Sequence, residues 1–448
     1  MSRRRSASVV LFAALTSISL PAQTPALAKE ERARAKEMLA TMKDAVKTIY
    51  YDPAYRGIDL NAHFAEAEAK LADATSISQL HLLIAQAMLR FGDSHTYFIP
   101  PTRPVTVDYG WTMQMIGDSC FVVTVTPGSD AEARGVRPGD RLLRVGTFTP
   151  TREGLWIAQY RYNVLAPESK LSVVVQTPGA PARQIELAAK LVQGQRSITL
   201  DIDSLQRTLD QEANRARQFR NHTARVGDIS VWKLSGFDFD PGDMDRTVKG
   251  ATKDATSLVL DLRGNGGGFV KSLEFLTGYF FDHDVKIADL KARKSTRGLT
   301  ARKRSPQFTG KMVVLVDSQS ASAAEMLARL LQIEKRAVVV GDRTSGLTMQ
   351  ARMVPAAVRT VDGFIPYGAA ISDAEPLMAD GKSLEGVGVT PDELLLPTQA
   401  DLAASRDPVL SRAVTLLGGT LDPVAAGKLF GARQNSAKWL EPCPLPRS

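Results

Sequence analysis

Residues 311–331 read KMVVLVDSQSASAAEMLARLL, and this stretch decides the fold of the C-terminal half of the chain. The apolar run 312–316 predicts a buried strand, which the polar residues 317–319 end. Small residues followed by Glu325 then predict the start of a helix. A serine in such a turn, Ser322, lies at the edge of a sheet and beside the unpaired N–H groups of the helix, which stabilise a developing negative charge. The same residues also suit an ordinary helix cap.

Around this stretch, short apolar runs alternate with helical stretches from Gly227 onward. The runs are ISVWKL (229–234), SLVLDLRG (257–264), MVVLVD (312–317) and AVVVGD (337–342). Such alternation predicts an α/β core over residues 227–400 with a largely parallel sheet. Residues 401–448 are expected to form an Ala-rich helical tail with a Pro-containing end.

A second segment with chemical potential, residues 257–268, ends in the glycines Gly266–Gly267–Gly268. Glycines let the backbone approach a ligand closely, and their N–H groups can point at a carbonyl or a phosphate. No Lys-Ser/Thr pair follows, so the segment is not a phosphate-binding loop, and its spacing does not fit a dinucleotide fingerprint.

The N-terminal half divides into three parts. Residues 29–104 show apolar residues at helical spacing and predict a helical cap, which ends in the polar turn FGDSHTYFIPP (91–101). Residues 105–192 change to short alternating strands. The polar and charged residues 193–226 are interpreted as a helical linker.

The first 28 residues have the features of a secretory signal peptide: Arg3–Arg5, an apolar run and an Ala-x-Ala site. Cleavage would lower the formal net charge from +8 to +5, without the dense basic patches that nucleic-acid binding needs. We therefore expect an exported protein, periplasmic or secreted, with no nucleic-acid partner and no integral membrane span. Cys120 and Cys443 are each expected to be single residues, although export would permit pairing. The histidines lack the spacing of metal ligands, so no metal or other cofactor is expected.

Residues 135–140, Gly-Val-Arg-Pro-Gly-Asp, resemble the corresponding segment of PDZ domains in bacterial proteases. The resemblance implies that an exposed strand edge binds a peptide by β-augmentation and that backbone N–H groups hold its terminal carboxylate. The matching loop contains Gly110, Trp111, Thr112 and Met113. A purely structural role for the module is the alternative.

Three motifs in order resemble the tail-specific (C-terminal processing) protease family: the DLRxNxGG strand end, the S-A-S-A-x-E turn and the segment SLEGVGVTPD (383–392). Together with the cap and the PDZ-like module, the resemblance covers nearly all of the chain after residue 28. It implies a ClpP/crotonase-like core with Ser322 as the nucleophile. It also implies an oxyanion hole made by the Ala323 N–H and that of Gly266 or Gly267.

The sequence departs from this family at one position. Many members supply a lysine base from a TFGKG-like segment, but here the segment reads TSGLTMQ (344–350), with Leu347 or a deletion at the lysine position. Leucine cannot accept a proton, and a serine hydroxyl is a poor nucleophile without a base. Either the protein is inactive or another residue is the base.

Residues 92–96, Gly-Asp-Ser-His-Thr, resemble the Ser-His element of the tricorn core proteases in the same superfamily. That resemblance implies the set Ser322, His95, Ser94 and Glu385, and a histidine needs no large pKa shift to act as a base at neutral pH. His95 could instead be a capping or packing residue, and Glu325 is interpreted as complementing its helix N-terminus.

The sequence thus predicts a serine endopeptidase that acts on unstructured or C-terminal polypeptide segments. The alternatives are an inactive peptide-binding homologue and, less favoured because of the PDZ-like module, a hydrolase of non-peptide esters or amides.

Overall fold

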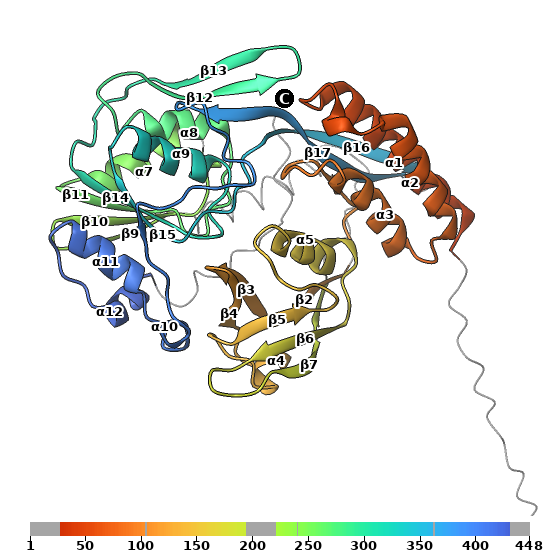
Figure 1. Ribbon diagram of the computed structural model, residues 1–448, viewed down its shortest axis with the longest axis horizontal. Coiled ribbons are helices and arrows are strands. Elements are labelled where there is room, and N and C mark those ends of the chain that lie inside the picture. The colour runs from red at the N-terminus through yellow and green to blue at the C-terminus, as the bar shows by residue number, and fades with distance from the viewer. Residues whose placement is uncertain (1–26, 104, 194–220, 240, 362, 431–448) are drawn as a thin grey trace, which may run out of the picture.

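The computed structural model describes residues 27–103, 105–193, 221–239, 241–361 and 363–430, which form three packed parts (Figure 1). The predicted signal peptide (1–28) lies almost entirely outside the described residues, as do most of the predicted linker, the last 18 residues of the predicted tail and Cys443. Cys120 is buried and free. Across the described ranges, none of the helices combines the length and apolar character that a bilayer crossing needs.

The N-terminal helices pack against a long antiparallel sheet rather than standing alone as a cap. The helices are α1 (Lys29–Ile49), α2 (Leu60–Lys70) and α3 (Ile77–Leu89), with single turns η1 (Tyr55–Gly57) and η2 (Leu71–Asp73). The sheet contains β1 (Tyr97–Ile99), β16 (Gln350–Thr360), β17 (Gly363–Met378), β12 (Val285–Ala292) and β13 (Thr296–Ala301). Its order is β1-β17-β12-β13, and β16 also pairs with β17. Strand β1 therefore brings the N-terminal part of the chain into a sheet made mostly by residues after 285.

The segment predicted to be a PDZ-like module, residues 105–192, contains a five-stranded antiparallel sheet with the order β3-β4-β5-β6-β7. Its strands are β3 (Trp111–Ile116), β4 (Ser119–Val125), β5 (Arg141–Val145), β6 (Lys170–Gln176) and β7 (Arg183–Ala188), and its helical segments are α4 (Asp130–Ala133), α5 (Leu155–Tyr160) and η3 (Arg161–Leu165). A two-stranded sheet of β2 (Val105–Asp108) and β8 (Lys190–Gln193) joins the module's two ends. Strand β3 is an edge strand.

The core is a six-stranded sheet with the order β18-β15-β14-β11-β10-β9, in which only β9 runs antiparallel to its neighbour. The strands are β9 (Asn221–Val226), β10 (Ile229–Leu234), β11 (Ser257–Asp261), β14 (Lys311–Val316), β15 (Val338–Gly341) and β18 (Glu393–Leu394). The predicted α/β class with a largely parallel sheet is confirmed. The predicted helical linker is wrong over its last six residues, because 221–226 alternate in exposure and pair with β10 as a strand.

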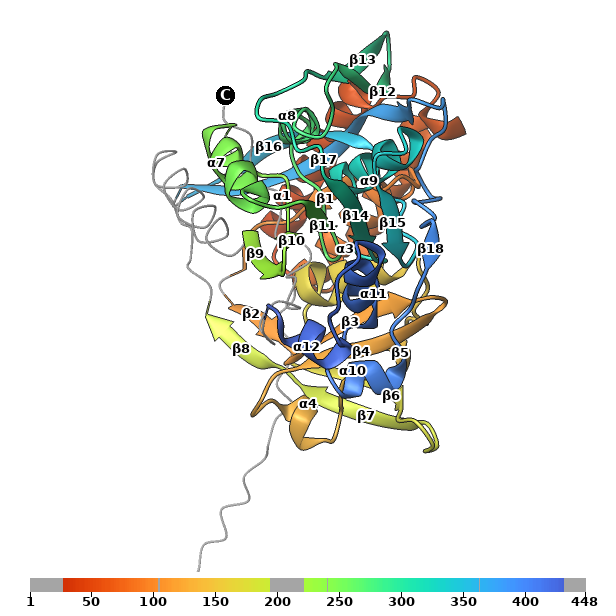
Figure 2. The ribbon, with the colours of Figure 1, turned by 90° about the vertical axis from the view of Figure 1, so that its left-hand side faces the viewer.

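Helices cover both faces of the core sheet, which explains why its central strands β11 and β14 are almost continuously apolar. Leu258 and Leu260 pack with Leu327 in one cluster, whereas Val259 faces the opposite cluster with Leu410. The first face is covered by α7 (Pro241–Thr252), α8 (Val270–Thr277) and α9 (Ala323–Ile333); the second is covered by α11 (Pro408–Leu416) and α12 (Pro423–Lys428), which follow α10 (Gln399–Ala403). Figure 2 shows the sheet edge-on between these helices.

Candidate active site

Ser322 is the residue immediately before α9, at the sharp turn that follows β14. Its φ is +55°, a left-handed conformation that a residue with a side chain adopts at a cost of about 1–3 kcal/mol. The turn is held by the Ser322 N–H, which donates to the Leu347 carbonyl (2.9 Å) and to Glu325 (3.1 Å). The strand-to-helix turn predicted from the sequence therefore places a half-buried serine at the carboxyl end of a central strand.

The glycine segment after β11 lies directly against this serine. A Cβ on Gly267, whose φ is +92°, would lie 2.5 Å from Ser322 Cβ and 3.0 Å from the Ala323 nitrogen. Asn265 ties the two segments together, since its carbonyl accepts from the Ala321 N–H (2.8 Å). Only glycine fits this close approach of two backbones.

The oxyanion-hole prediction needs one correction within this segment. The Gly267 N–H donates to the Asn265 side chain at 2.8 Å, so it does not point at a substrate. Among the described residues, the N–H groups of Ala323, Gly266 and Gly268 have no hydrogen-bond acceptor. These three amides are the available donors for a negative oxygen beside Ser322.

His95 belongs to a second cluster, held between α3 and β1. Its ring Nδ1 lies 2.6 Å from Ser94 Oγ, and that hydroxyl donates to Glu385 Oε2 at 2.9 Å. Because the single hydroxyl proton of Ser94 goes to Glu385, Ser94 accepts from an Nδ1–H. This tautomer leaves the lone pair on His95 Nε2, the atom that a base needs.

Asp93, which the sequence reasoning did not single out, fixes the backbone of this cluster. It is buried and accepts from the hydroxyls of Tyr50 (2.8 Å) and Ser372 (2.6 Å) and from the backbone N–H of His95 (3.0 Å). Tyr50 and Ser372 lie far from Asp93 in sequence, so the local signal was only an acidic residue at the start of the turn that contains Ser94 and His95.

The two titratable groups of the cluster are shifted in ways that suit a neutral imidazole. Burial lowers the pKa of His95 to about 4, and only the negative charge of Asp93 opposes this shift. Burial also raises the pKa of Glu385, against three hydrogen bonds, from the Thr348 amide and from the amide and hydroxyl of Ser94, that favour its charged form. At neutral pH the imidazole of His95 is thus uncharged.

The segment 347–349 joins the serine and histidine clusters. The Leu347 carbonyl binds the Ser322 amide, whereas the amides of Thr348 (2.8 Å) and Met349 (3.2 Å) donate to Glu385 Oε2. Ser322, Thr348 and Met349 also line one cavity. Ser322 and His95 share no direct hydrogen bond among the described residues, so the two clusters adjoin through this segment.

Leu347 occupies the sequence position at which many related proteases carry a lysine base. Its carbonyl accepts from the Ser322 N–H and its own N–H donates to Glu325, but its side chain has no atom that can accept a proton. In the part of the chain that the structure describes, no three His, Cys, Asp or Glu residues gather as metal ligands would.

The predicted peptide-binding residues lie at one end of the PDZ-like sheet. Gly110 forms a turn with a φ of +72°, and Trp111, Thr112 and Met113 begin the edge strand β3. Further along β3, the Gln114 amide donates to Asp317 (2.8 Å). The PDZ-like edge strand therefore contacts the loop that leads to the serine.

Comparison with known proteins agrees with this architecture. The sequence model for Peptidase family S41 matches residues 228–395. This match and the relatives described below make the chain similar to Peptidase family S41 and to tail-specific and C-terminal processing proteases, which supports a serine-type peptidase.

A tail-specific protease of Haemophilus influenzae is 26% identical over 287 residues, which are 61% of this chain and 39% of that protein. A chloroplastic C-terminal processing peptidase of Tetradesmus obliquus is 26% identical over 384 residues, 79% of this chain and 75% of that protein. The crystal structure of mature CPAF superposes with a TM-score of 0.61 at 15% identity, covering 84% of this chain and 95% of the other. The last similarity concerns the fold alone.

Proposed function

We propose that this chain is an exported serine endopeptidase that cleaves polypeptides through an acyl-enzyme on Ser322, with His95 as the base. The observation that supports it best is the hydrogen-bonded series Glu385–Ser94–His95, which leaves Nε2 as the acceptor. The series adjoins the cavity that Ser322 lines, through the amides of Thr348 and Met349.

In the proposed reaction, Ser322 Oγ attacks the scissile carbonyl carbon while its proton passes to His95 Nε2. The new oxyanion accepts from the Ala323 N–H and from Gly266 or Gly268. The tetrahedral intermediate collapses by breaking the C–N bond, and the imidazolium gives its proton to the leaving amine. Water then hydrolyses the ester with the same base. Glu385 stabilises the imidazolium through Ser94, which relays the interaction.

The PDZ-like module would engage the substrate first. Strand β3 is at the edge of its sheet, so an extended peptide can pair with it as a further strand. The terminus of that peptide would then lie near Gly110–Met113. We therefore propose unstructured or C-terminal segments of polypeptides as substrates. The basic, apolar and Ala-x-Ala pattern of residues 1–28 supports export to the periplasm or beyond.

An inactive peptide-binding protein is the second candidate, and Leu347 favours it, because the lysine of related enzymes is absent. Its fold and PDZ-like module would be the same. The two candidates differ in whether Ser322 is reactive.

Labelling with a fluorophosphonate probe separates the candidates. We expect the wild-type protein to be labelled, Ser322→Ala not to be labelled, and His95→Ala to react about 100-fold or more slowly. Labelling that survives Ser322→Ala removes the nucleophile assignment. Undiminished labelling of His95→Ala removes the base, and an unlabelled wild type favours the peptide binder.

A further inference from the structure

Glu325, in the first turn of α9, is completely buried, and none of the residues that the structure describes places a cation beside it. Every group that faces its two oxygens is a neutral donor. These donors are the hydroxyls of Thr344 (2.5 Å) and Ser345 (3.3 Å) and the amides of Gly346 (2.7 Å), Leu347 (3.0 Å) and Ser322 (3.1 Å). A helix cap needs one or two such bonds, so this carboxylate does more than cap α9.

The donors identify what Glu325 fixes. Four of them belong to the turn 344–347, and the fifth is the amide of Ser322. The same turn returns a carbonyl, that of Leu347, to the Ser322 amide. The next two residues, Thr348 and Met349, donate their backbone N–H groups to Glu385, which also accepts from the Ser94 hydroxyl. The turn thus contacts both the serine and the histidine clusters.

We propose that Glu325 is a positioning residue for the peptidase reaction: its carboxylate fixes the turn 344–347, and through that turn it sets Ser322 against the Glu385–Ser94–His95 series. This rests on the proposed function. Many members of the family that the sequence resembles carry a lysine base in this turn; here the turn has no side chain that can be the base, and the buried carboxylate holds the turn in place.

The ionisation of Glu325 gives the proposal a measurable signature. Only the ionised carboxylate can accept from all five groups, because a protonated one must turn its own hydrogen toward the Thr344 or Ser345 hydroxyl and so loses a bond from the turn; the Ser345 hydroxyl can then donate to the Ser320 carbonyl alone. Burial raises the pKa of Glu325 to about 7. Across the turn lie Glu385 and His95, and burial lowers the pKa of His95 to about 4. We therefore expect reactivity to fall below about pH 7 because of Glu325, well above the titration of His95.

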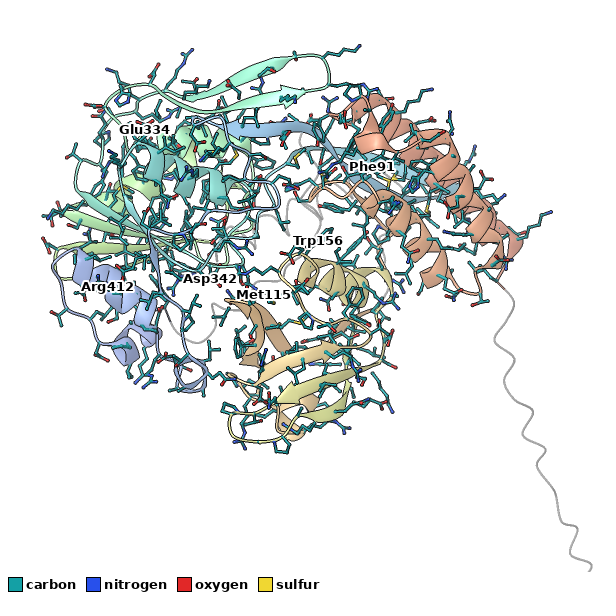
Figure 3. All side chains as sticks on the ribbon, in the orientation of Figure 1. Phe91, Met115, Trp156, Glu334, Asp342 and Arg412 are labelled. Carbon is teal, nitrogen blue, oxygen red and sulfur yellow. The ribbon has the colours of Figure 1, made fainter. Side chains whose placement is uncertain are left out.

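The test compares Glu325→Gln with Glu334→Gln, a matched change at the exposed far end of the same helix (Figure 3). Fluorophosphonate labelling and peptide hydrolysis are measured from pH 5 to pH 9. Glu325→Gln should lower the labelling rate and kcat about 100-fold at pH 8, since misplacing a reacting group by about 1 Å has this effect, and leave KM near the wild-type value. The decline near pH 7 should disappear in this variant and persist in Glu334→Gln.

Two results would overturn the proposal: Glu325→Gln reacting at the wild-type rate, or retaining the decline near pH 7. If the variant does not fold, the wild type decides. A protonated-carboxyl infrared band that titrates near pH 7 together with the labelling rate supports the proposal, whereas a flat rate between pH 6 and 8 overturns it. An unlabelled wild type, or labelling that survives Ser322→Ala, would instead show that the proposed function itself is wrong.

Discussion

Glu325 is a buried carboxylate and Glu385 a half-buried one, and among the described residues both meet neutral donors rather than cations. Glu325 faces five hydroxyl and amide donors, and Glu385 accepts from Ser94, Thr348 and Met349. Burial raises the pKa of both groups because hydrogen bonds replace only part of the lost hydration. Ionising either carboxylate in the folded protein therefore reduces the stability of the fold.

The stability of the protein should consequently depend on pH through Glu325. Its pKa is raised in the folded state to about 7 from 4.5, so the folded protein binds this proton more tightly than the unfolded one. The resulting stabilisation is complete below about pH 4.5 and is lost as the pH rises through about 7, at no more than about 1.4 kcal/mol per pH unit. We expect wild type to lose free energy of unfolding relative to Glu325→Gln between pH 5 and 7.5, measured by urea titration. A difference that stays constant, or changes in the opposite direction, would contradict the pKa shift.

At the scale of residues, the sequence identifies some of the site because its signals are local. Ser322 stands out by a strand, a polar break and a helix start in consecutive residues. Glu325 was hidden by the same pattern, since a serine followed by a glutamate three residues later also describes a helix cap. What distinguishes it is its contact with residues 344–347, a tertiary contact that no local spacing reveals. The hydrogen bond from the Gly267 N–H to the Asn265 side chain is likewise visible only in the three-dimensional structure.

At the scale of elements, the apolar runs predicted the central strands correctly, whereas strand β9 was missed. Its sequence, NHTARV, is too polar to indicate a buried strand, and it forms because the backbone of β10 offers an antiparallel edge. Similarly, nothing local predicts that β1 pairs with β17, about 270 residues later. That pairing is what brings His95 to the core.

The elements around Ser322 also predict a substrate preference. The cavity beside it is lined by apolar side chains from α8, β12, α9, β17 and the segment before β16: Val270, Leu290, Met326, Pro376 and Met349. Desolvating a charged group there has no compensation. We expect peptides with an apolar residue before the scissile bond to be cleaved at least about 100-fold more efficiently than those with Asp.

A matched peptide series that differs only at this residue, measured as kcat/KM, tests the preference. Leu290→Arg should shift it toward Asp, and Val361→Arg, an exposed change remote from the cavity lining, should not. Equal cleavage of the apolar and acidic peptides by wild type would show that the cavity does not bind this side chain.

At the scale of the whole molecule, the three parts are joined by polar contacts near the serine. The PDZ-like module meets the core where Met115 and Asp342 lie together (Figure 3), and the Met115 carbonyl accepts from the Ser318 hydroxyl. Sequence patterns delimit such parts, because each has its own periodicity. They do not show how the parts dock, since a docking surface has no repeat of its own.

The strongest of these contacts is the ion pair of Arg152 with Asp342, whose side chains are only 9% and 7% exposed. Burial raises the pKa of Asp342 even with this guanidinium beside it, and removing one partner of a buried pair typically costs about 3–5 kcal/mol. We expect Arg152→Ala to cost about 3 kcal/mol, because Asp342 keeps its amide donors from Gly117 and Arg343, and to lower the melting temperature.

Adding Asp342→Asn should restore part of the loss, because the orphaned carboxylate is then gone. The exposed pair of Arg134 with Asp130 is the control, and Arg134→Ala should cost no more than about 1 kcal/mol. Equal losses for Arg152→Ala and Arg134→Ala would show that the Arg152–Asp342 pair does not hold the PDZ-like module against the core.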